Sequence, residues 1–126
     1  MTTYPLFTWL FGPQLLGVMF LVIWTILHYY PPKKINNLYG YRTTLSQSSQ
    51  QAWDEANRYS ANYMIKLSVV MIVVGAITTT LLHIIPMPAK VLVLATVFLV
   101  ILSGIAPAIL MIVATERHLE KLFGNK

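Results

Sequence analysis

The sequence predicts an all-α membrane protein with three transmembrane helices in up-down-up order and a short interfacial amphipathic helix before the second. Apolar residues make up 56% of the 126 residues and charged residues only 10%, whereas soluble domains have about 25% charged residues. The charges are also unevenly placed, because residues 1–32, 67–89 and 91–115 contain none. Each stretch is long enough to cross a hydrocarbon core about 30 Å thick, which takes about 20 helical residues.

The first transmembrane helix is predicted over about residues 10–30. Aromatic residues gather at both of its ends, as in the interfacial belts of membrane helices. Pro31 and Pro32 end the helix, because proline lacks an amide hydrogen and disfavours a helical residue before it. The stretch has neither a basic start nor a small-residue cleavage site, so we interpret it as an uncleaved helix rather than a signal peptide.

Residues 31–62 form the predicted cytoplasmic loop, whose first part is rich in turn-forming residues and whose second part has helical spacing. Ser46 is a plausible N-cap, and Ser48 with Gln51 offers a second one. The helical part is expected to form the short amphipathic helix. It either lies on the membrane surface or leads directly into the second transmembrane helix.

The second and third transmembrane helices are predicted over about residues 63–85 and 91–115, with residues 116–126 as a cytoplasmic tail. Small residues mark two faces suited to close helix packing, and a proline inside the third helix predicts a kink. These faces pack either within one chain or between copies, so a homo-oligomer is one expectation. The residues concerned are Gly75, Ala76, Gly104, Pro107 and Ala108.

Orientation follows from the Lys and Arg residues: seven lie in the loop and tail, an eighth, Lys66, lies at the edge of the loop, and only Lys90 lies on the other side. The positive-inside rule then places the N-terminus outside and the C-terminus in the cytoplasm. Lys33 and Lys34 are interpreted as topology determinants, because two charges fall short of the four to eight that mark a lipid-binding cluster. A further expectation is an ion pair between Glu116 and either Arg42 or Lys66, at the cytoplasmic interface.

The loop and the helix after it contain the candidate binding residues. Gly40 permits a positive φ, and Arg42 has a rigid five-donor guanidinium suited to phosphate, carboxylate or carbonyl oxygens. Trp53 and Asn57 lie one helical turn apart and share a face. Two interpretations stay open: a polar, aromatic pocket at the inner interface, or interfacial anchors. The candidates are Asn36, Tyr39, Gly40, Tyr41, Arg42, Thr43, Ser46, Trp53 and Asn57.

These residues, in the spacing Asn36-x-x-x-Gly40-x-Arg42-Thr43-x-x-Ser46 followed by Trp53 and Asn57, resemble the signature of the SdpI family of bacterial membrane proteins. The resemblance implies a multi-pass protein of the bacterial cytoplasmic (inner) membrane. The type member of that family is an immunity protein against a secreted antimicrobial peptide toxin, and a second role, holding a transcriptional repressor at the membrane, is attributed to it. The chain resembles the C-terminal module of that type member.

The expected function is therefore binding: recognition of a toxin-like peptide or membrane partner through the loop, with membrane lipids as surroundings. The alternatives are a signalling adaptor that sequesters a soluble repressor, and a lipid-headgroup-binding or lipid-handling protein with Arg42 on the phosphate. We expect no enzyme, because no nucleophile–base pair is evident, and no direct contact with nucleic acid. We expect neither a cofactor nor a metal site, since His28, His83 and His118 are widely separated.

Overall fold

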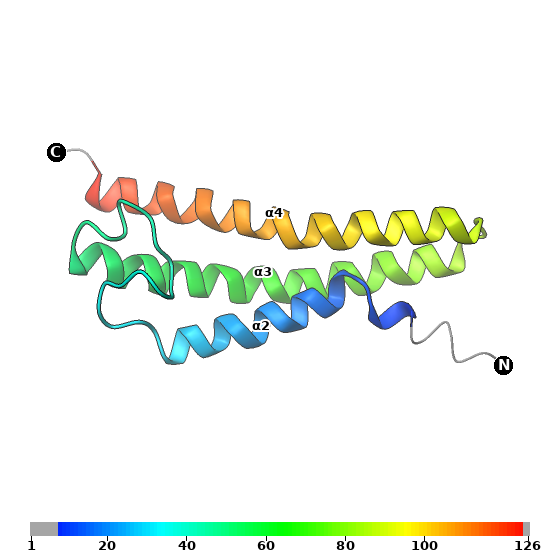
Figure 1. Ribbon diagram of the computed structural model, residues 1–126, viewed down its shortest axis with the longest axis horizontal. Coiled ribbons are helices and arrows are strands. Elements are labelled where there is room, and N and C mark those ends of the chain that lie inside the picture. Colours follow the sequence, from blue (N-terminus) through cyan, green and yellow to red (C-terminus); the bar gives the residue numbers. More distant parts are fainter. Residues whose placement is uncertain (1–7, 125–126) are drawn as a thin grey trace.

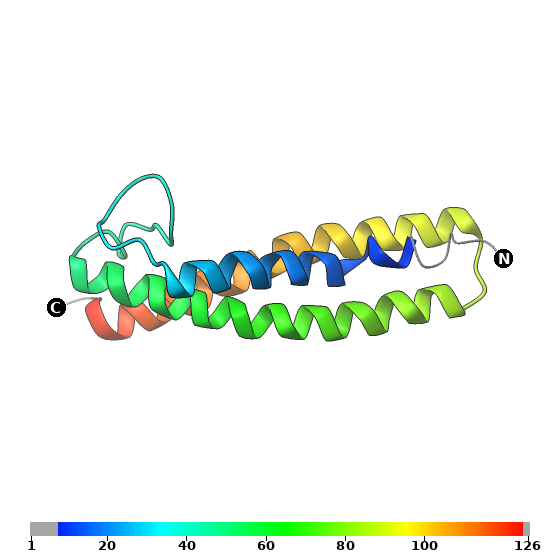
Figure 2. The same cartoon turned by 90° about the horizontal axis from the view of Figure 1, so that it is seen from below.

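Three helices lie side by side in the computed structural model, which describes residues 8–124 (Figure 1). They are α2 (Pro13–Tyr29), α3 (Gln50–Ile84) and α4 (Ala89–Phe123). The chain passes along α2, returns along α3 and passes back along α4, so neighbours in the sequence are antiparallel (Figure 2). The described residues contain no strand, and the predicted all-α class is confirmed.

The helices differ in their capacity to cross a membrane. By length and composition, α3 and α4 are each long and apolar enough to span it, with 35 residues apiece. The apolar helix α2 has 17 residues, which is about 26 Å at the usual rise of 1.5 Å per residue. Two helices thus have the length and composition of membrane spans, and the third span remains a prediction.

The predicted amphipathic segment and the second membrane helix form one unbroken helix, α3. The second alternative, in which the segment leads directly into the membrane helix, is the one observed. The N-cap is Ser49 rather than Ser46 or Ser48, and its side chain accepts a hydrogen bond from the amide of Ala52 at 3.1 Å. At the same end of the bundle, α4 continues through Pro107 and past residue 115 to Phe123.

Small residues bring α2 and α3 into close contact. A Cβ atom added to Gly17 would lie 2.8 Å from Cγ1 of Ile72, and one added to Gly75 would lie 2.6 Å from the backbone nitrogen of Gln14. Such contacts are the usual basis of helix association in membranes, where lipid tails remove the hydrophobic drive between helices. The face at Gly75 therefore packs within the chain.

A polar cluster joins the first turn of α2 and the segment before it to the C-terminal end of α3. The side chains of Gln14 and Thr79 are buried, and the hydroxyl of Thr79 donates to the Gln14 amide oxygen at 3.0 Å. The indole of Trp9 donates to the hydroxyl of Thr80 at 2.9 Å. Buried polar groups far from water need partners, and this cluster supplies them from two segments of the chain.

Much of α4 is uncovered by the rest of the chain. Its buried residues are Pro107, Thr115 and Leu119, all in the half that leads to the C-terminal end. A Cβ atom added to Gly104 would meet nothing within 4 Å, so the predicted packing face at Gly104 has no partner within the described chain. Between residues 91 and 106, the exposed side chains of α4 are all aliphatic or aromatic, as expected for a surface that faces lipid.

The two glycines give a matched test of packing. We expect Gly75→Ala to destabilise the bundle by about 1–3 kcal/mol, because the methyl group must displace the backbone of α2. Gly104→Ala should be neutral or stabilising by up to about 1 kcal/mol, since alanine is the better helix former. Thermal unfolding in detergent measures both. Equal effects from the two substitutions would contradict the packing described.

Candidate functional site

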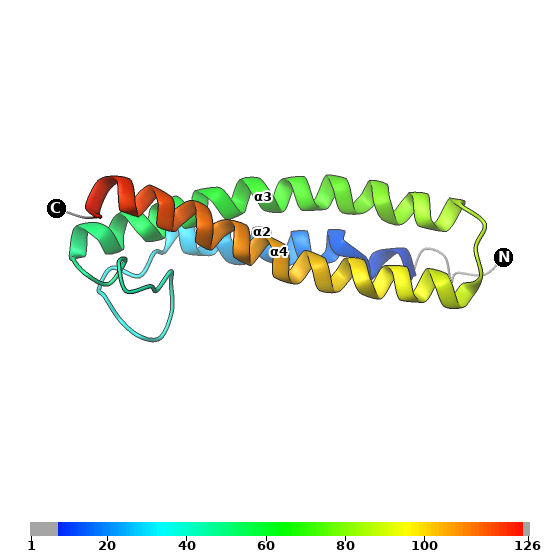
Figure 3. The same cartoon turned by 90° about the horizontal axis from the view of Figure 1, so that it is seen from above.

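The candidate site lies where the loop folds back against the N-terminal turns of α3 and the C-terminal turns of α4 (Figures 1 and 3). We call this region the cap and define it as residues 30–61 and 111–123. A small apolar core joins its three parts, with Tyr41 from the loop, Ala56 from α3 and Leu119 from α4. Leu45, Met111 and Phe123 pack around them. The loop is thus folded onto the helices by a core of its own.

Asn57 holds the loop by its backbone. Its side-chain oxygen accepts a hydrogen bond from the amide of Tyr41 at 2.7 Å, and its side-chain nitrogen donates to the carbonyl of Trp53 at 2.9 Å. The residue is only 6% exposed, so these bonds form where water does not compete well. A side chain on α3 thereby fixes the position of a loop residue 16 positions earlier.

Gly40 is required at this contact for two reasons. Its φ is +99°, a backbone conformation that residues with a Cβ rarely adopt. A Cβ atom there would also lie 2.6 Å from the side-chain oxygen of Asn57 and 2.6 Å from Cγ of Pro32. The glycine therefore lets the loop approach both Asn57 and the proline turn.

Trp53 fixes the start of the loop from the same face of α3. Its side chain is fully buried, and the indole nitrogen donates to the carbonyl of Pro32 at 2.7 Å. This bond holds the proline turn that follows α2. Trp53 and Asn57 do share a face, and that face binds the loop rather than opening to solvent.

The remaining polar residues of the pattern shape two local turns. The side-chain oxygen of Asn36 accepts hydrogen bonds from the amides of Leu38 and Tyr39, at 2.9 and 3.0 Å. The hydroxyl of Ser46 accepts from the amide of Thr43 at 2.7 Å, so Ser46 closes a turn instead of capping a helix. Asn and Ser favour such side-chain to backbone bonds, which stabilise turns.

Glu116 connects α4 to the loop, but without the predicted cation. Its Oε1 accepts from the hydroxyl of Tyr41 at 2.7 Å and from that of Thr43 at 2.6 Å. Among residues 8–124 no ion pair joins it to Arg42 or Lys66. The guanidinium of Arg42 donates instead to the carbonyl of Asn37. Two hydroxyls from the folded loop reach the carboxylate, which satisfies it without a positive charge.

The environment of Tyr41 favours the neutral phenol. Burial raises the pKa of the hydroxyl above its usual value, and the hydrogen bond to the Glu116 carboxylate raises it further. At neutral pH the phenol therefore remains a hydrogen-bond donor to Glu116. The contact is a charge-assisted hydrogen bond, which is stronger than one between neutral groups.

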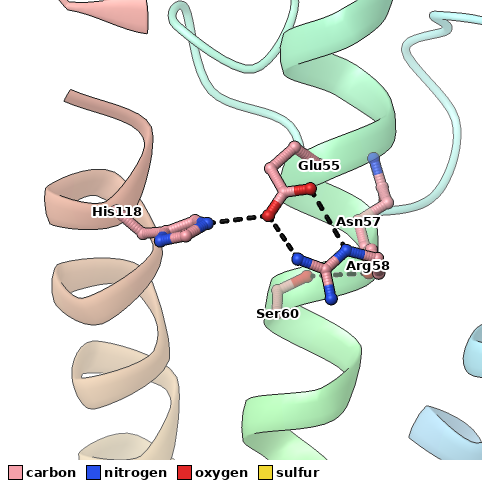
Figure 4. Close-up of polar contacts among 5 residues, drawn as sticks. All are labelled: Glu55, Asn57, Arg58, Ser60 and His118. Atoms are coloured by element: carbon pink, nitrogen blue, oxygen red, sulfur yellow. Dashed lines mark hydrogen bonds and ion pairs between the residues drawn. The ribbon is translucent and has the colours of Figure 1, made fainter. Parts of the chain in front are cut away.

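A second connection between α3 and α4 involves Glu55, Arg58 and His118 (Figure 4). Oε1 of Glu55 lies 2.5 Å from Nη2 of Arg58 and 2.7 Å from Nε2 of His118. The His118 ring stacks on Tyr59, with ring centroids 4.2 Å apart. The Arg58 guanidinium lowers the pKa of the Glu55 carboxyl, and His118 contributes less. This cluster is not predictable from the sequence, because no local signal relates residues 55 and 118.

The structure divides the candidate residues by exposure. Tyr41, Ser46, Trp53 and Asn57 are buried and hold the loop. Tyr39 is 51% exposed and Arg42 is exposed. Their neighbour Leu38 is 85% exposed. The exposed tip formed by Leu38, Tyr39 and Arg42 is therefore the part of the pattern free to contact another molecule.

Within residues 8–124 no three His, Asp or Glu side chains are placed together so as to hold a metal ion. The exposed part of the loop presents apolar, aromatic and cationic side chains.

Three comparisons relate the chain to known proteins. A family model described as the SdpI/YfhL protein family matches residues 33–115. An uncharacterized protein, YfhL of Bacillus subtilis (strain 168), is 44% identical over 59 residues, which cover 47% of this chain and 54% of that protein. The match thus spans about half the length of the relative. No solved structure matches the chain.

Loss of the Glu116 contact should release the loop. We expect Glu116→Ala to raise the rate of tryptic cleavage after the exposed Arg42 by about tenfold or more. The reason is that charge-assisted hydrogen bonds contribute about 1.5–3 kcal/mol and cleavage follows the population of the open form. Mass spectrometry of the fragments measures the rate. Glu120→Ala, on the exposed next turn of α4, is the control, and equal acceleration in both variants would contradict the role of Glu116.

Proposed function

The chain belongs to the SdpI/YfhL family, and we propose that it is a small integral membrane protein that recognises a toxin-like peptide or another membrane protein through its cap. The observation that carries the proposal is the exposed tip. Leu38, Tyr39 and Arg42 project from a loop whose backbone is held by buried side chains. An apolar, an aromatic and a guanidinium group on a rigid support are the residue types typical of binding surfaces.

The internal bonds of the loop favour binding in a second way. Ordering a flexible loop on association reduces affinity, because its conformational entropy is lost. Here Asn36, Ser46 and Asn57 order the loop before any partner arrives. The buried residues of the pattern thus support the tip, and the tip contacts the proposed partner.

The proposed location is the cytoplasmic membrane of a bacterium, with the cap in the cytoplasm and the N-terminus outside. This orientation rests on the excess of Lys and Arg near the cap. It places the tip within reach of either a membrane partner or a soluble one. A soluble repressor held at the membrane is therefore the alternative partner of the same surface.

Cysteine labelling tests the orientation, because the chain has no cysteine of its own. In intact cells, a membrane-impermeant maleimide should label Lys90→Cys and Leu10→Cys, whereas Lys121→Cys should react only after permeabilisation. Suppose that Leu10→Cys behaves like Lys121→Cys and reacts only after permeabilisation, while Lys90→Cys reacts in intact cells. That result would show that α2 does not cross the membrane. Labelling of Lys121→Cys in intact cells would reverse the orientation.

Site-specific cross-linking tests recognition. A photoreactive phenylalanine analogue at position 39, in membranes of the bacterial host, should give a discrete peptide or protein adduct. The substitution Arg42→Ala should lower the yield of that adduct severalfold. The same analogue at Tyr30, a tyrosine 76% exposed just after α2, is the control and should not give that adduct. Identical adducts at both positions, or only lipid at position 39, would overturn the proposal. A soluble repressor in the adduct would select the adaptor alternative.

A further inference from the structure

A cavity of about 410 Å³ lies between the end of α2 and the start of α3, beside the proline turn. Leu27 and His28 line it from α2, Lys33 from the loop, and Asp54 and Arg58 from α3. Neither Tyr39 nor Arg42 belongs to its lining. The cavity therefore does not include the exposed tip, although Pro32 and Asn57, which hold the loop, also line it.

The charges around this cavity favour an anion. Lys33 and Arg58 are cations, and among residues 8–124 Lys33 has no ion-pair partner. Arg58 engages Glu55 through Nε and Nη2, which leaves the other terminal nitrogen for a further acceptor. Asp54 is the acidic residue of the lining, and its Oδ1 accepts from the side chain of Gln50 at 2.8 Å.

The position of the cavity relates it to the membrane surface. It lies where α2 ends at Tyr29, and Tyr29 and Tyr30 are 71% and 76% exposed, as tyrosines at the headgroup level are. Leu27 forms an apolar wall, and Ile23, one turn earlier on α2, is 48% exposed. The cationic groups thus lie at the end of an apolar helix surface suited to an acyl chain.

From these observations we infer that the cavity binds a phosphate group, with Lys33 and Arg58 contacting its oxygens. Guanidinium and ammonium groups are the usual partners of phosphate in proteins. An anionic phospholipid headgroup and free phosphate share this chemistry, and the position of the site at the end of α2, beside the exposed Tyr29 and Tyr30, favours the headgroup. Lys33 then binds a ligand in addition to contributing to topology.

Native mass spectrometry of the full chain in detergent tests the site, with phosphatidylglycerol, phosphatidylcholine and inorganic phosphate as probes. The expected result is stronger retention of phosphatidylglycerol than of phosphatidylcholine. Lys33→Gln should weaken that retention by about fivefold, the effect of one cation at a membrane surface, and Lys33→Arg should restore it. Lys34→Gln is the matched control, because Lys34 is adjacent and exposed but does not line the cavity.

The outcomes separate the sources of the phosphate. Displacement of phosphatidylglycerol by millimolar inorganic phosphate would assign free phosphate as the ligand, and resistance to displacement would assign the lipid. Equal losses in Lys33→Gln and Lys34→Gln, or equal retention of the two lipids, would overturn the site in favour of diffuse surface attraction. Thermal unfolding of each variant shows that it is folded. Cross-linking at position 39 does not depend on these results, so the two proposals fail separately.

Discussion

The arrangement of the cap depends on a single amide side chain, that of Asn57. It binds the backbone of Tyr41, so it fixes where the loop lies irrespective of the side chains that the loop carries. Once the backbone of Tyr41 is placed, its phenol reaches Glu116 on α4. Gly40 has to adopt its positive φ beside the same amide. One residue of α3 thereby determines the loop conformation and, through the loop, a contact between α3 and α4.

Trp53 complements Asn57 one helical turn earlier. It binds Pro32 at the start of the loop, whereas Asn57 binds the loop in its middle. The two attachments leave residues 33–39 as a short segment between fixed points, and Asn36 orders that segment from within. Polar backbone groups near a membrane need such partners, because an unpaired group costs free energy wherever water is scarce. The rigidity of the exposed tip follows from this requirement.

Part of this structure follows from local sequence signals and part does not. The charge-free stretches identify the helical segments, and the spacing of Trp53 and Asn57 correctly places both on one face. The continuity of α3 was left open, because hydrophobic periodicity does not show whether an amphipathic turn stays on the axis of the next helix. The ion pair predicted for Glu116 was wrong, because the hydroxyls of Tyr41 and Thr43 compete with cations for a carboxylate. The Glu55–His118 contact joins residues 63 positions apart and has no local signal.

Arg58 lies between the cavity and the contact that joins α3 to α4. On one side it lines the cavity beside Lys33, and on the other it holds Glu55, which in turn contacts His118 on α4 (Figure 4). A guanidinium has five donors in a fixed plane, so a phosphate in the cavity and the Glu55 carboxylate share one rigid group. Glu55 uses Nε and Nη2 of Arg58, so the remaining terminal nitrogen is the one available to the phosphate, and binding in the cavity does not require the ion pair to break.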